Sequence, residues 1–308
     1  MLKLYYHDNP KNSYYNGIIF CVDGHIKHGG LADRFYGALC TFALCKIYGI
    51  DFKLHYTFPF ELTTFLKPNR YDWSISKDLV VYNNKQAKPY VLLGDFDWYK
   101  KFKKITTLQH KQIHLYANVR VLDNINEFYG TTFTYKQLYE ELFQPSENLQ
   151  STFKNIFKEL PPRYNSLCFR FRNAFGDFKE NNFLELSETE KIGLLQYAHK
   201  QMHALITEYN LPIVVTADSP TFLKSISNIE NVYSVYQNKG GVHMDYTNNA
   251  DKEIYKQSFI DYYALSKGEN IFCCRGNHLD DSGFPYFAAT IENKERKFFP
   301  TYLNDREL

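Results

Sequence analysis

The second half of the chain alternates strand-like and helix-like segments, and this alternation restricts the fold more than any other feature of the sequence. Apolar stretches at 166–173 and 211–218 are separated by a long segment with helical spacing at 188–210. Strands that are joined through helices of this length form parallel sheets with right-handed crossovers. We therefore predict an α/β fold whose ligands bind at the carboxyl ends of the strands.

The first half of the chain mixes the same two kinds of segment. From Leu31 onward, apolar residues recur every three or four positions, which predicts an amphipathic helix at 31–49 that stops at Gly49. A second helix is predicted at 134–143. Strand-like runs lie at 16–24, 51–56, 78–84 and 89–95.

Two adjacent prolines mark the best candidate for a domain boundary. Pro161 and Pro162 follow a helical segment at 149–160. Proline cannot continue a helix and disfavours helical backbone in the residue before it. We therefore predict two domains, 1–160 and 161–308.

Charge and cysteine usage narrow the class of protein. The net charge of the 308 residues is +2, so the sequence predicts no nucleic-acid partner. Neither a secretion signal nor an apolar run of the roughly 20 residues that a membrane helix needs is found. The six cysteines form no CxxC pair and predict buried free thiols in a reducing compartment. We expect a cytoplasmic protein.

One segment, 98–112, is both basic and aromatic. Lysines at helical spacing beside aromatic residues are typical of a solvated helix face. The alternative is peripheral contact with anionic lipid head groups on the inner face of a membrane. Aromatic residues make up 18% of the chain, which fits either an aromatic-rich core or a groove for carbohydrate or nucleotide.

The first predicted strand end carries two adjacent glycines. Gly29 and Gly30 precede the helix at 31–49, in the stretch HGGLADRF. Glycines let a backbone approach a ligand closely, and the free N–H groups of the helix that follows attract phosphate. The stretch matches neither a Walker loop nor GxGxxG. A plain strand-to-helix turn therefore remains open.

A second strand end carries two arginines. In SLCFRFRN, Arg170 and Arg172 alternate with apolar residues, which predicts that both lie on one face of a strand, about 7 Å apart. Guanidinium groups bind phosphate through paired hydrogen bonds and stay charged. The alternative is an edge strand whose arginines lie in water.

Two further strand ends carry small polar residues. Asp218 and Ser219 follow the apolar run at 211–217, and Ser282 and Gly283 precede an apolar helix. Both serines are also natural helix caps, so a purely structural role is the alternative at each place. The four strand ends together predict a site for an anionic nucleotide ligand.

Other chemistries have weaker support. Asp95 and Asp97 could hold a divalent ion, but so short a pattern arises often by chance. His243 is a lone histidine in a predicted loop and has no assigned role. Neither GxSxG nor HExxH is present.

The motifs resemble those of the fucosyltransferase superfamily that includes bacterial α-1,2- and α-1,6-fucosyltransferases and protein O-fucosyltransferases. GGLADRF is similar to the first family motif, with Ala32 in place of a glycine. RFRNAFGD resembles the family's His-x-Arg-x-Gly-Asp motif, with Arg170 in place of the histidine. GDFDWYKKF, TADS and SGFPYFAA resemble three others, in the same order along the chain.

The resemblance implies a GT-B fold with two Rossmann-like domains facing across a cleft, an acceptor-side domain at 1–160 and a GDP-sugar domain at 161–308. It implies an inverting, metal-independent transfer of L-fucose from GDP-β-L-fucose to a hydroxyl of a bacterial surface glycan or glycolipid. No cofactor and no metal would be needed. The alternatives are transfer from another GDP-sugar, such as GDP-heptose, and a non-catalytic module that binds nucleotide sugars or glycans.

The resemblance also assigns residues. Arg172 would hold the diphosphate and stabilise its charge as it leaves, with help from Arg170. The residues that would contact the donor are Gly29, Gly30, Arg34, Arg170, Asp218, Ser219, Ser282, Gly283 and Phe284. The candidates for a base are Asp23, His25, His28 and Asp33. Asp33 is named with Arg172 as the catalytic pair.

Overall fold

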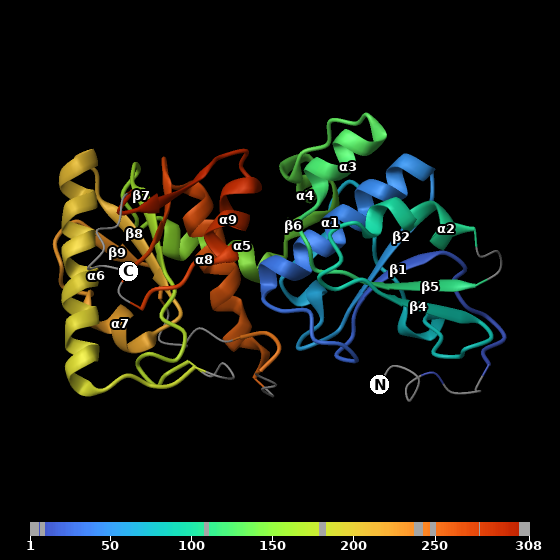
Figure 1. The fold of residues 1–308 in the computed structure, drawn as a ribbon, viewed down its shortest axis with the longest axis horizontal. Helices are drawn as coiled ribbons and strands as arrows, with labels where there is room; N and C mark the ends of the chain where they lie inside the picture. The colour runs from blue at the N-terminus through green and yellow to red at the C-terminus, as the bar shows by residue number, and fades with distance from the viewer. Residues whose placement is uncertain are drawn as a thin grey trace. The chain divides into compact units, whose positions relative to one another are not determined.

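The computed structural model describes residues 6, 10–107, 111–178, 183–236, 243–246, 251–276 and 278–301. The chain divides into two compact units, Met1–Ser146 and Glu147–Leu308. In Figure 1 each unit contains its own sheet with helices around it.

Unit 1 is built on a parallel four-stranded sheet in the order β2-β1-β5-β4. β1 (Ile18–Val22) is buried along its whole length, so it is the centre of the unit's core. Its neighbours are β2 (Phe52–Tyr56), β5 (Gln112–Tyr116) and β4 (Ala87–Val91). Because β1 and β5 are adjacent, the loops that follow them meet at one edge of the sheet.

Helix α1 (Leu31–Tyr48) lies close to this sheet because of a glycine in its middle. A Cβ on Gly37 would come within 2.0 Å of the carbonyl oxygen of Ala117, which follows β5. The helix can therefore approach the loop only with a glycine at this position. Gly49 ends the helix in a left-handed conformation, as the sequence predicts.

The rest of unit 1 consists of short elements. The helices are η2 (Leu62–Thr64), η3 (Lys77–Leu79), η4 (Trp98–Lys101), α2 (Phe102–Thr106), α3 (Leu122–Tyr129) and α4 (Tyr135–Leu142); β3 (Leu66–Pro68) pairs antiparallel with β6 (Phe143–Pro145). The strand predicted at 78–84 is wrong, because the 3-10 turn η3 occupies its start and residues 80–84 are not in a strand. The strand β5 was missed, since its polar Gln112 and His114 obscure the apolar pattern.

The basic segment has the predicted solvated face. Its lysines at 100, 101, 103 and 104 are exposed. Trp98, Tyr99, Phe102 and Ile105, in contrast, are buried. Residues 108–110 of the segment lie outside the described residues.

Unit 2 is built on a parallel five-stranded sheet in the order β11-β10-β7-β8-β9. The strands are β7 (Asn165–Phe169), β8 (Ile213–Ala217), β9 (Val232–Ser234), β10 (Ile271–Cys274) and β11 (Arg296–Phe299). From β7 the chain runs outward to β8 and β9, and then returns to the other side of β7 to form β10. The strand order therefore reverses between β7 and β10, which is where open α/β sheets bind their ligands.

The helices of unit 2 pack around this sheet. They are α5 (Glu147–Phe157), α6 (Glu188–Tyr209), α7 (Pro220–Ser225), η5 (Lys252–Tyr255), α8 (Lys256–Lys267) and α9 (Gly283–Thr290). The unit begins at Glu147, so the boundary lies before α5 and not at the predicted 160/161. The physical reason is that α5 packs on α8, with the rings of Phe153 and Tyr263 4.8 Å apart.

All six cysteines are free and buried, which confirms the prediction of buried thiols. No helix among the described residues combines the length and the apolar character needed to cross a membrane.

Candidate functional site

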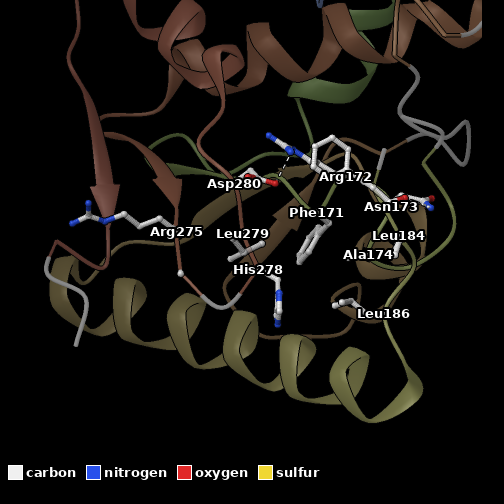
Figure 2. Close-up of a pocket in the computed structure, with 12 residues that line it drawn as sticks. Phe171, Arg172, Asn173, Ala174, Leu184, Leu186, Arg275, His278, Leu279 and Asp280 are labelled. Atoms are coloured by element: carbon white, nitrogen blue, oxygen red, sulfur yellow. Dashed lines mark hydrogen bonds and ion pairs between the residues drawn. The ribbon is translucent and has the colours of Figure 1, made fainter. Parts of the chain in front are cut away.

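A cavity of about 490 Å³ opens in unit 2 between the loops that follow β7 and β10 (Figure 2). Residues 171–174 line it from the β7 side, and residues 275, 276 and 278–280 line it from the β10 side. Phe183, Leu184 and Leu186 complete the wall. The cavity therefore lies at the point where the strand order of the sheet reverses.

The β7 loop differs from the predicted strand. β7 ends at Phe169, and Arg172 has a left-handed backbone with φ of 53°. Arg170 and Arg172 are therefore not alternate residues on one strand face, and that expectation is wrong. A non-glycine residue in this conformation is strained by about 1 kcal/mol and persists only where its surroundings hold it there.

Asp218, at the carboxyl end of β8, holds this loop in place. One carboxylate oxygen accepts the backbone N–H of Phe171 at 2.8 Å, and the other accepts the backbone N–H of Arg172 at 2.9 Å and Nη1 of Arg170 at 2.6 Å. The carboxylate is thus satisfied by the chain itself. These contacts hold the loop that carries Arg172. The predicted contact of Asp218 with a guanosine stays a prediction.

The Arg172 side chain points along the cavity rim and is fixed on two sides. Its Nε lies 2.7 Å from Oδ2 of Asp280, as the dashed line in Figure 2 marks. Its guanidinium carbon lies 3.7 Å from the ring centre of Phe183, which is a close cation–π contact. Sequence reasoning missed both partners, although Asp280 is only two residues before the predicted Ser282.

The β10 loop is tied to the β7 loop. The backbone N–H of Asp280 donates to the carbonyl of Arg170 at 3.1 Å. His278 has φ of 67° and Gly276 has φ of 91°, so both residues have left-handed backbone. Arg275 also lines the cavity, but in Figure 2 its side chain points away from Arg172. Its Nε donates to the carbonyl of Pro300 at 3.2 Å.

The two predicted serines cap helices. The Ser219 hydroxyl accepts the N–H of Phe222 at 3.1 Å at the start of α7 and donates to Asp177 at 2.9 Å. The Ser282 hydroxyl accepts the N–H of Phe284 at 3.2 Å at the start of α9. Ser282, Gly283 and Phe284 thus stand at the start of α9, outside the cavity wall. Of the donor residues predicted in unit 2, the structure places Arg172 in the cavity.

In unit 1 the loop after β1 is organised around a buried carboxylate. Asp23 accepts the hydroxyls of Tyr82 at 2.7 Å and Tyr116 at 2.8 Å, and lies 3.1 Å from Nδ1 of His25. Burial opposes ionisation of Asp23, but the hydrogen bonds from His25, Tyr82 and Tyr116 outweigh it and hold its pKa below the usual value. Asp23 is therefore a structural anion and a weak base.

The Gly-Gly turn and the first turn of α1 are held by Asp33, which was predicted to be catalytic, and by Arg34, which was predicted to bind the donor. Asp33 accepts the N–H of Gly30 at 2.9 Å and so caps α1. Arg34 is buried, and its guanidinium donates to the carbonyl of Phe58 at 2.7 Å and to that of Gly29 at 3.3 Å. Gly29 has φ of 94°, which requires glycine.

The aspartate pair at 95 and 97 is neutralised by lysines. Asp95 lies 2.8 Å from Nζ of Lys101, and Asp97 lies 2.7 Å from Nζ of Lys100. Among the described residues, no group of three or more histidines, cysteines and carboxylates is placed to hold a metal ion. His243 accepts the N–H of Asp245 at 3.2 Å and packs against the Tyr246 ring.

No protein-family model matches the chain, and no curated protein matches it in sequence. Solved structures do match. An Arabidopsis thaliana FUT1 mutant in complex with GDP superposes with a TM-score of 0.56 at 12% identity, over 95% of this chain and 73% of that one. The NodZ α-1,6-fucosyltransferase soaked with GDP-fucose gives a TM-score of 0.51 at 9% identity, over 90% of this chain and 93% of that one. The fucosyltransferase NodZ from Bradyrhizobium gives a TM-score of 0.50 at 11% identity, over 89% of this chain and 93% of that one.

These matches extend over both units, and at such identities they establish the fold. The predicted α/β class with two Rossmann-like units is confirmed by the parallel sheets and by this likeness. The chain has the GT-B fold of fucosyltransferases whose structures were solved with GDP or GDP-fucose.

Proposed function

We propose that the chain is a glycosyltransferase that transfers L-fucose from GDP-β-L-fucose to a hydroxyl group of a bacterial surface glycan or glycolipid, with inversion at the sugar carbon. The observation that carries this proposal is the cavity between the β7 and β10 loops, with Arg172 fixed on its rim. The cavity has the volume of a typical ligand site and lies where α/β sheets bind nucleotides. The GDP and GDP-fucose in the matching structures support the choice of donor.

The chemistry needs a cation near the departing diphosphate. As the acceptor oxygen bonds to the anomeric carbon, the bond from that carbon to the diphosphate breaks, and negative charge grows on GDP. A preorganised guanidinium stabilises that charge more than it stabilises the bound substrate, so it lowers the barrier. Arg172 is the residue for this role. Arg170 helps indirectly, because its guanidinium donates to Asp218, which holds the Arg172 loop.

The acceptor proton needs a base, and we assign the acceptor side to unit 1. Among the predicted candidates we keep Asp33 for this role, because its carboxylate lies at the Gly-Gly turn, where it accepts the N–H of Gly30. The low pKa of Asp23 disfavours it as the base. The reaction is proposed to need no metal, which is supported by the lysine pairing of Asp95 and Asp97. A cytoplasmic location with peripheral membrane contact is part of the same proposal.

Calorimetric titration with nucleotides tests the proposal most directly. GDP should bind the full chain with a dissociation constant in the micromolar range, and UDP should bind at least tenfold more weakly. GDP should also raise the melting temperature, because a ligand of the native state stabilises it by mass action. Release of GDP from GDP-fucose, and not from GDP-mannose or a GDP-heptose, then identifies the sugar. Equal binding of UDP and GDP, or none of either, would overturn the proposal.

A further inference from the structure

Arg172 is held with one edge of its guanidinium occupied and the other available. Asp280 takes the Nε side at 2.7 Å, and the Phe183 ring covers one face. Among the described residues, the Arg172 guanidinium has no other hydrogen-bonding partner. Of its five N–H groups, the four on the two Nη atoms are thus left for a ligand. The side chain retains 26% of its accessible surface, on the cavity rim.

The carboxylate that holds it is itself fixed by the backbone. The N–H of Asp280 donates to the Arg170 carbonyl, and the left-handed His278 precedes it by two residues. Asp218 fixes the backbone of Arg172 from the other side. Both ends of the ion pair are therefore anchored in loops that the sheet positions. Because both backbones are fixed, only the two side chains have to be ordered for the ion pair to form.

We infer that Asp280 is a positioning residue: by holding Nε of Arg172, it presents the Nη edge to the β-phosphate of a nucleoside diphosphate. The inference rests on the proposed function and goes beyond it by naming the residue that orients the guanidinium. The forked Nη edge matches two phosphate oxygens. A monophosphate lacks the β-phosphate, so its binding does not use this edge. Asp280 thus contributes to the preference for a diphosphate over a monophosphate.

The opposite role for Asp280 makes an opposite prediction. If its carboxylate competed with the phosphate for Arg172, removal of its charge would tighten the binding of GDP. If it positions Arg172, removal of its charge weakens GDP binding. The occupied Nε edge favours positioning, because the carboxylate and a phosphate on the Nη edge can bind the same guanidinium together.

The test compares GDP and GMP binding by calorimetry in the wild-type chain and in variants. Asp280→Asn should weaken GDP binding about tenfold, which corresponds to about 1.4 kcal/mol, and should change GMP binding less than twofold. Asp281→Asn is the matched control. It removes the same charge from the next residue, which pairs with Arg296, and should change neither affinity more than twofold. Thermal melting and circular dichroism confirm that each variant is folded.

Arg172→Lys provides a second test in which Asp280 has lost the group it positions. In that background Asp280→Asn should weaken GDP binding by less than twofold, because contacts that act through a shared partner are not additive. Unchanged or tighter GDP binding by Asp280→Asn, or an equal loss of GMP binding, would overturn the inference alone. A wild-type chain that binds neither nucleotide would instead overturn the proposed function.

Discussion

At the scale of single residues, Arg172 combines three features that together point to a functional role. Its backbone is left-handed, and its backbone N–H donates to the buried carboxylate of Asp218. Its side chain contacts Asp280 and the ring of Phe183 at the rim of a cavity. Strain that is maintained by surrounding contacts clusters at functional sites. Arg34 differs, since its guanidinium is buried and donates to a carbonyl group of its own unit.

Arg172→Ala should therefore reduce GDP release from GDP-fucose sharply. Loss of one preorganised electrostatic donor typically lowers turnover by about 10²–10³-fold. Arg163→Ala is the control, because this exposed arginine pairs with Glu269 on the surface and should leave turnover unchanged. The measurement is the initial rate of GDP release for folded protein. Turnover within threefold of wild type for Arg172→Ala would refute its role.

Another residue-scale prediction concerns His114 in β5, which is fully buried. Its ring bonds to the hydroxyl of Tyr6 and to Gln112, and burial lowers its pKa to about 3. In the unfolded chain a histidine has a pKa of about 6.5. Between these values the unfolded state binds the proton more readily, so stability should fall as the pH falls from about 6.5 toward 3.

Urea unfolding at several pH values measures this effect. His114→Gln removes the titrating ring while it retains hydrogen-bonding capacity, and it should flatten the stability profile between about pH 6 and pH 4 relative to wild type. The comparison uses the slopes, since the substitution also lowers stability at every pH. An unchanged slope in His114→Gln would show that other groups dominate acid unfolding.

At the scale of elements, two glycines in the interiors of helices differ in the space that surrounds a Cβ at their position. Gly37 in α1 faces the Ala117 carbonyl at a distance that excludes a Cβ, whereas Gly193 in α6 faces open space. Gly37→Ala should therefore destabilise the protein by several kcal/mol, or prevent unit 1 from folding. Gly193→Ala should stabilise it by about 0.5–1 kcal/mol, because alanine favours helix. Chemical denaturation of the two variants gives the sign of each, and the same sign for both would contradict this packing.

Periodicity predicted the long elements well and the short ones poorly. The amphipathic runs at 31–49 and 188–210 are helices α1 and α6, because burial of an apolar stripe shows directly in the sequence. The strand β5 was missed because Gln112 and His114 are buried but polar, and their partners come from distant segments. The site was mispredicted for the same reason. The alternation of apolar residues predicted that Arg172 lies on a strand, but its backbone N–H instead donates to Asp218, which is distant in the sequence.

At the scale of the whole molecule, the net charge and the sheet topology bear on whether the proposed reaction needs a metal ion. The net charge of +2 gives the chain no overall negative field that would attract divalent ions. In the proposed function, the positive charge near the diphosphate comes from Arg172 of unit 2, which lies at the reversal of the strand order. A fixed guanidinium and a divalent ion serve the same electrostatic purpose at a leaving diphosphate.

Excess EDTA should therefore leave GDP release from GDP-fucose within twofold of the untreated rate. The alternative site is defined by Asp95 and Asp97, whose lysine partners would have to give way to an ion. Asp95→Asn and Asp97→Asn should each retain wild-type turnover, with or without added Mn²⁺. Loss of activity in EDTA that Mn²⁺ restores in the wild type, but not in these two variants, would establish a metal site there and would transfer the role of leaving-group stabilisation from Arg172 to the ion.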